Sequence, residues 1–188
     1  MLSLYEIIDI AIMCLFLGFI FKDVFVRPRQ YTDPLKALMH GAYRKGNFWY
    51  AVALTAPAVI LHEFGHKFVA TAYGMQATFQ AAYLWLGLGA ILKLMNFGFI
   101  FFVPAYVTIR GVGSPLAFSI IAFAGPAVNL LIWLAMILVE RKNLVTAKHM
   151  HYVILTKRIN MFLFIFNMLP IPLFDGFQVY SGLLQTIF

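Results

Sequence analysis

Long apolar runs dominate this chain and restrict what it can fold into. Four of them, at positions 4–26, 48–73, 114–139 and 152–169, are long enough to cross a hydrocarbon layer of about 30 Å as a helix. Of all residues, 63% are hydrophobic and only 11% are charged, whereas soluble domains are nearer half apolar and a quarter charged. The sequence therefore predicts a multi-pass protein of the cell membrane that folds in a lipid bilayer.

The shorter segments complete the predicted fold. Residues 75–81 alternate polar and apolar side chains, and residues 97–109 are rich in aromatic and β-branched types, so both indicate strands. Residues 83–95 and 177–188 are apolar but too short to span, which is typical of re-entrant or interfacial pieces; a tight pair of short spans is the alternative for 75–110. We expect an all-α polytopic membrane protein, a single domain over residues 1–188, with about five to six transmembrane or half-membrane helices and a small re-entrant β element.

Two basic connectors separate the spans, at residues 27–47 and 140–158. The net charge of +7 is gathered mainly there, where Lys and Arg meet anionic headgroups. These cations do not form one face, so nucleic acid is not an expected partner. Residues 34–43 are expected to form a short interfacial helix. The single cysteine, Cys14, excludes an internal disulfide.

A five-residue motif in the second apolar run indicates a metal site. His62 and His66 are four residues apart, so a helix presents both imidazoles on one face. Glu63, next to the first histidine, can act as a general base on a water held by the metal. Ionisable side chains at a helix centre in lipid cost about 2.5 kcal/mol or more, so such a cluster indicates function. Chance spacing of core histidines is the alternative.

A catalytic zinc ion needs a third protein ligand, and depth in the bilayer discriminates between the candidates. His62 lies roughly 21 Å beyond Phe48 along the helix. If the run at 152–169 is parallel to the second run, only Asp175 returns to the level of His62. The alternative role for Asp175 is an N-cap of the last short helix. The candidates expected nearer the Phe48 surface are His40, Glu140, His149 and His151.

Asn129 is unusual inside an apolar span, where residues 125–129 read Gly-Pro-Ala-Val-Asn. An interhelical hydrogen bond explains it most simply, and lining the metal cavity to hold a substrate backbone is the functional alternative. Pro170 and Pro172 break the helix before Asp175, and such backbone is tolerated at membrane depth only within protein or beside water.

Three motifs in order resemble the site-2 protease family of intramembrane zinc metalloproteases, in its compact prokaryotic form without a PDZ domain or CBS pair. Residues 62–66 match HExxH, residues 125–129 match GPxxN, and residues 167–176 match NxxPxPxxDG. Phe174 stands where the family usually has Leu. The match covers a catalytic core of about 48–178.

The resemblance implies a zinc metalloendopeptidase that cleaves transmembrane segments of substrate membrane proteins. Carried over by position, His62, His66 and Asp175 bind one Zn²⁺ per chain, Glu63 is the catalytic base, and Asn129 binds substrate. It also implies that residues 75–110 form a sheet to which an unwound substrate could add a strand.

Two rivals remain open: a non-catalytic membrane scaffold or chaperone with a structural zinc, and a metal transporter. Loop charge would place both basic connectors in the cytoplasm and the site outside. The family places the site end in the cytoplasm.

Overall fold

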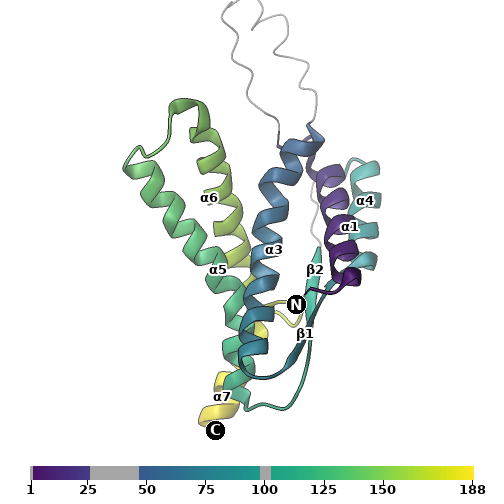
Figure 1. Cartoon of the computed structure of the whole chain (residues 1–188), viewed down its shortest axis with the longest axis vertical. Helices are drawn as coiled ribbons and strands as arrows, with labels where there is room; N and C mark the ends of the chain where they lie inside the picture. The colour runs from purple at the N-terminus through teal and green to yellow at the C-terminus, as the bar shows by residue number, and fades with distance from the viewer. Residues whose placement is uncertain (1, 26–46, 98–102) are drawn as a thin grey trace, which may run out of the picture.

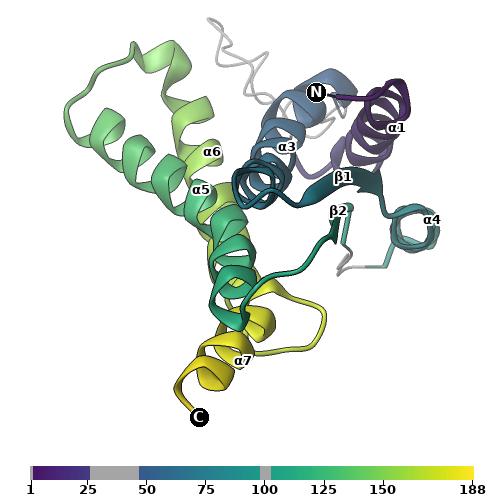
Figure 2. The same ribbon diagram turned by 60° about the horizontal axis from the view of Figure 1, so that its bottom comes forward.

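Helix α3 (Phe48–Ala72) is the central element of the structure (Figures 1 and 2). The computed structural model describes residues 2–25, 47–97 and 103–188, so the interfacial helix expected at 34–43 lies outside the described residues. The side chain of Asn47 accepts a hydrogen bond from the backbone N–H of Tyr50 at 3.0 Å and caps the first turn. Gly74, with φ of +74°, follows the last turn, as expected of a helix stop.

On one side of α3 lie α1 (Leu4–Phe21), α4 (Tyr83–Leu94) and a sheet of β1 (Gln76–Ala81) and β2 (Ala105–Arg110) (Figure 2). The strands are antiparallel, and Gln76 pairs with Arg110. The strand expected at 75–81 is confirmed as β1, whereas the one expected at 97–109 is shorter, over Ala105–Arg110, and α4 lies between the two in sequence. Because Gln76, the first residue of β1, pairs with Arg110, the last residue of β2, the segment 76–110 begins and ends at the same level of the molecule.

Carboxylates of α1 hold this sheet in place. Glu6 accepts a hydrogen bond from the backbone N–H of Phe79 at 2.8 Å and pairs with Lys67 of α3. Asp9 accepts from the N–H of Ala81 at 3.3 Å. Apolar side chains from all these elements pack beneath: Met13, Leu17, Ala56, Val59, Phe79, Ala81, Leu86 and Ala105. Polar anchoring and burial together fix α1 and β1 against α3.

On the other side of α3 lie α5 (Pro115–Arg141), α6 (Ala147–Asn167) and α7 (Asp175–Ile187). In Figure 1 the chain descends through α3, rises through α5 and descends again through α6. The two helices that lead to the metal-site motifs, α3 and α6, therefore run the same way, as the depth argument requires.

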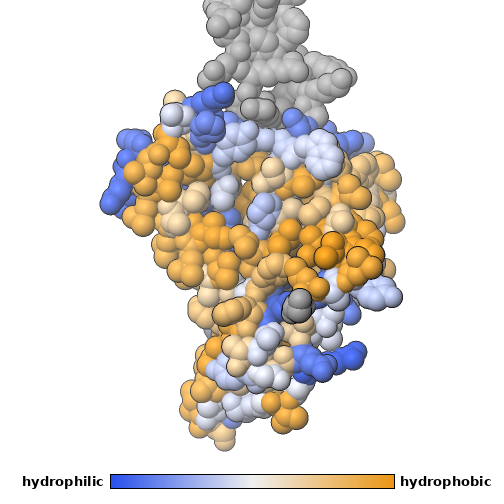
Figure 3. Space-filling view, in the orientation of Figure 1, coloured by the Kyte–Doolittle hydropathy of each residue, from blue (hydrophilic) through white to orange (hydrophobic). Residues whose placement is uncertain are grey.

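Three helices, α1, α3 and α5, are long and apolar enough to cross a membrane within the described residues. The expectation of five to six spanning or half-spanning helices was therefore too high. Helices α4 and α7 have only 12 and 13 residues, whereas a span needs about 20. Helix α6 has 21 residues, but Lys157 and Arg158 lower its hydropathy. Figure 3 shows a broad hydrophobic band across the middle of the molecule, consistent with a membrane protein.

Candidate metal centre

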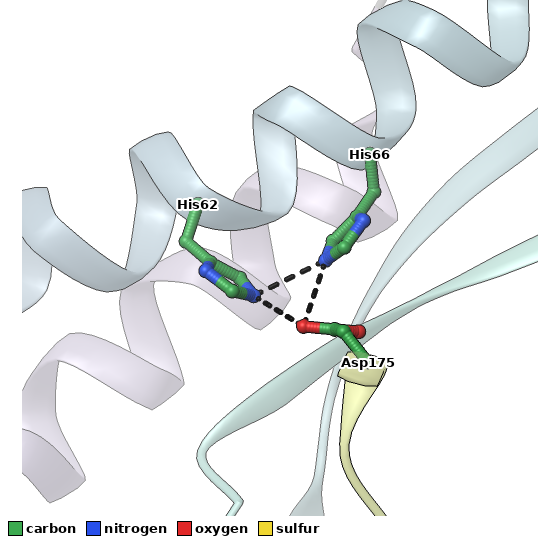
Figure 4. Close-up of side chains that lie close together, drawn as sticks. All are labelled: His62, His66 and Asp175. Atoms are coloured by element: carbon green, nitrogen blue, oxygen red, sulfur yellow. Dashed lines mark hydrogen bonds and ion pairs between the residues drawn. The ribbon is translucent and has the colours of Figure 1, made fainter. Parts of the chain in front are cut away.

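Three side chains from distant parts of the chain converge at one point (Figure 4). The Nε2 atoms of His62 and His66 are 3.1 Å apart. Asp175 Oδ2 lies 3.1 Å from His62 Nε2 and 3.4 Å from His66 Nε2. Both histidines are buried, and Asp175 is partly exposed. The structure thus brings together the three residues that the sequence singled out as metal ligands.

Backbone and side-chain carbonyls fix the protonation of both imidazoles. His62 Nδ1 donates to Asn129 Oδ1 at 2.6 Å, and His66 Nδ1 donates to the backbone oxygen of Ile121 at 2.8 Å. A carbonyl oxygen can only accept, so each Nδ1 carries a proton, which in the neutral ring leaves the lone pair on Nε2. Two Nε2 atoms and a carboxylate oxygen then face one another, an arrangement that suits a cation between them.

These donors fit a divalent transition metal such as zinc. Zinc is bound by imidazole nitrogen and carboxylate oxygen at about 2.0–2.2 Å, so tetrahedral ligand atoms are separated by roughly 3.3–3.5 Å. The separations of 3.1–3.4 Å here are close to that value. Histidines that donate their second nitrogen to an oxygen are typical of metal ligands. Within the described residues, this trio is the group of His, Cys, Asp and Glu that could hold a metal ion.

Asp175 reaches the histidines because the chain turns back after α6. Phe174 is the N-cap of α7, and Asp175 lies in its first turn without capping the helix through its side chain. A Cβ on Gly176 would lie 2.5 Å from the backbone carbonyl of Met168, so the tight turn requires glycine. Ser119 of α5 donates to the backbone oxygen of Val179 at 3.2 Å and anchors α7.

The glycine of the second motif, Gly125, lies directly against His62 and His66. A Cβ on Gly125 would stand 2.2 Å from His66 Nε2 and 2.8 Å from His62 Nε2. A Cβ on Gly65 would stand 2.7 Å from the backbone oxygen of Ala124. These two glycines let α3 and α5 approach closely, as small residues do between membrane helices. Gly125 leaves the space in which the ligand atoms meet.

Asn129 is fully buried, and its contacts lead to the metal ligands. Its Oδ1 accepts from His62, while its Nδ2 donates to Asn160 Oδ1 at 2.8 Å and to the backbone oxygen of Ala58 at 3.3 Å. These bonds orient His62; substrate binding by Asn129 stays a prediction. Asn160, 1% exposed, also donates to Thr156 O at 2.8 Å and is a site-supporting residue that the motifs missed. In the sequence, the sign of this role was an amide side chain inside an apolar run.

Glu63 is buried beside His62 and lines a cavity of about 450 Å³ with it. Apolar side chains of α1, α3, α6 and β2 form much of the wall, among them Leu17, Val59, Ala105, Ile159, Phe162 and Phe166. An apolar cavity lined by a few polar groups is typical of a binding site. Glu63 and His62 are among its polar lining residues.

The other histidines of the described chain lie at the far end of α3. The ring of Tyr50, near the start of α3, is 6.1 Å from that of His151 and 5.4 Å from that of Tyr152. Glu140 pairs with Lys157. His149 lies two residues before His151 on α6. The positions of these residues agree with the prediction that their depth excludes them as the third metal ligand. His40 lies outside the described residues.

Comparison with known proteins gives one relevant similarity. The chain is 39% identical over 126 residues to a protein of Methanocaldococcus jannaschii named "Putative zinc metalloprotease MJ0611". This similarity supports a zinc metalloprotease. The alignment covers 64% of this chain and 63% of that protein, so the chain spans less than two thirds of the length of its relative. No protein-family model and no solved structure match the chain.

Proposed function

We propose that this chain is an intramembrane zinc metalloprotease of the site-2 type, which hydrolyses peptide bonds within transmembrane segments of other membrane proteins. One observation carries the proposal: Asp175 converges with the Nε2 atoms of His62 and His66, and both histidines lie on a helix apolar enough to span a membrane. Three ligands leave one position of a tetrahedral ion open, which distinguishes a catalytic site from a structural one.

His62, His66 and Asp175 would hold the zinc ion. When bound, zinc supplies a Lewis acid that polarises a carbonyl oxygen and makes water more acidic. The Glu63 carboxylate accepts a proton from the attacking water and later delivers it to the leaving amine nitrogen as the C–N bond breaks. Asn129 and the Ile121 carbonyl keep both imidazoles in place, and most of the cavity wall is apolar.

Strand addition to β2 is our proposal for how a substrate is presented. One edge of β1 pairs with β2, and N–H groups of its other edge, at Phe79 and Ala81, are bonded to carboxylates of α1. Pro104 and Ala105, at the start of β2, line the cavity beside Glu63. An extended peptide paired with β2 would therefore lie next to the reactive groups, and unwinding of the substrate helix exposes the backbone for this pairing.

The decisive experiment is cleavage of a transmembrane substrate by pure protein in detergent, with zinc, with a chelator, and with zinc restored. We expect cleavage only with zinc, one zinc ion per chain, and loss of cleavage in Glu63→Gln with zinc still bound. A protein that binds zinc tightly but cleaves nothing would instead be the scaffold. Full activity of Glu63→Gln would refute the assigned base.

A further inference from the structure

A single arginine lies on the wall of the cavity that contains Glu63 and His62. Arg158 is on α6, exposed, and surrounded by apolar lining residues such as Leu155, Ile159 and Phe162. Because its side chain is exposed and lies beside this apolar wall, the guanidinium can meet an anionic group that enters the cavity.

No carboxylate within residues 2–25, 47–97 and 103–188 pairs with Arg158, although its neighbour Lys157 pairs with Glu140. The other acidic residues of these ranges are engaged elsewhere: Glu6 with Lys67, Asp9 with Ala81, Asp23 with Lys93, and Asp175 with the histidines, while Glu63 belongs to the site. Other unpaired cations of these ranges, such as Arg110 and Arg141, lie at the ends of their elements. Arg158 is in the middle of a helix.

The position of Arg158 relates it to the reactive groups. Asn160 is two residues further along α6, about 3 Å along the helix axis, and bonds to Asn129, which in turn bonds to His62. Arg158 therefore lies at about the level of His62. On α3 the same cavity extends from His62 back to Thr55, a rise of about 10 Å at 1.5 Å per residue. An extended peptide advances about 3.3 Å per residue, so the cavity accommodates about three substrate residues on this side of the cleaved bond.

We propose that Arg158 binds a carboxylate side chain, Asp or Glu, of the substrate within about three residues of the cleaved bond. The inference rests on the proposed function, because it assigns the substrate class of the same site. A guanidinium binds a carboxylate through two parallel hydrogen bonds, which gives both orientation and charge neutralisation. Membrane segments that carry an acidic residue near the cleavage point are then preferred over wholly apolar ones.

The test compares a set of transmembrane substrates that differ in one residue, Asp or Asn, at each of the three positions on either side of the cleaved bond. At one position the intact enzyme should cleave the Asp substrate with kcat/KM higher by about tenfold, the usual effect of a charge-assisted hydrogen bond. Arg158→Glu should remove this preference and favour a Lys at that position. The matched control is Lys157→Gln, which should retain the preference for Asp.

A binding measurement keeps the inference testable if cleavage is never observed. Labelled Asp and Asn peptides are titrated against Glu63→Gln protein, with and without Arg158→Glu, in neutral and in anionic lipid. We expect tighter binding of the Asp peptide only when Arg158 is present. Equal binding of both peptides, or an equal loss for both in Arg158→Glu, overturns the proposal. An Arg158-dependent response to anionic lipid alone would assign the arginine to headgroups instead.

Discussion

Replacing Asn129 by Leu tests the hydrogen-bond chain that orients the metal ligands. The change keeps the number and branching of the side-chain heavy atoms but removes the oxygen that accepts from His62 Nδ1 at 2.6 Å. Loss of such an outer contact typically lowers metal affinity or activity 10- to 100-fold, and about 1.36 kcal/mol corresponds to each tenfold. We therefore expect zinc binding to weaken by about 1.4–2.7 kcal/mol.

The same substitution leaves Asn160 Oδ1 without the Asn129 amide that donates to it at 2.8 Å. A buried acceptor without its partner destabilises the fold by about 1–3 kcal/mol. The double variant Asn129→Leu/Asn160→Leu removes both partners, so part of this stability should return while zinc binding stays weak. That separation distinguishes a role in metal binding from a role in folding.

Zinc affinity is measured by competition with a chromophoric chelator, and unfolding is followed by circular dichroism in detergent. Asn160→Leu alone is the matched control, because it lowers stability but leaves the bond between Asn129 and His62. We expect its zinc affinity to fall less than that of Asn129→Leu, because the bond to His62 itself remains. Unchanged zinc affinity in Asn129→Leu would refute the orienting role of this chain of amides.

Two further substitutions test the packing around the site. Gly125→Ala should abolish zinc binding, because the new Cβ would stand 2.2 Å from His66 Nε2. The control is Gly87→Ala, at a position with open space around the new Cβ. Retained zinc binding in Gly125→Ala would contradict the geometry of the site. Glu6→Gln should destabilise the fold by about 3 kcal/mol in detergent unfolding, because Lys67 loses its buried partner. The double variant Glu6→Gln/Lys67→Leu, which keeps an acceptor for the Phe79 N–H, should recover much of this loss. An unaltered unfolding midpoint in Glu6→Gln would show that the pair contributes little.

Local sequence was sufficient to predict the histidine pair of the candidate metal site and the helix that carries it. The i, i+4 spacing of His62 and His66 places both rings on one face of any α-helix, whatever surrounds it. Alternation at residues 75–81 likewise predicted β1, because side-chain direction has period two in a strand. Span counting from length was less reliable, because α6 is long enough but carries Lys157 and Arg158.

Tertiary structure decided which residues come together with His62 and His66. Asp175 could be favoured by depth, but its contact with both imidazoles depends on the turn at Gly176 and the packing of α7 on α5. In the sequence, Asn160 was one of several polar residues and Arg158 was one of several charged residues, so neither stood out. The cavity and the amide chain arise only when α3, α5 and α6 pack together, and contacts between distant segments leave no periodic signal in the chain itself.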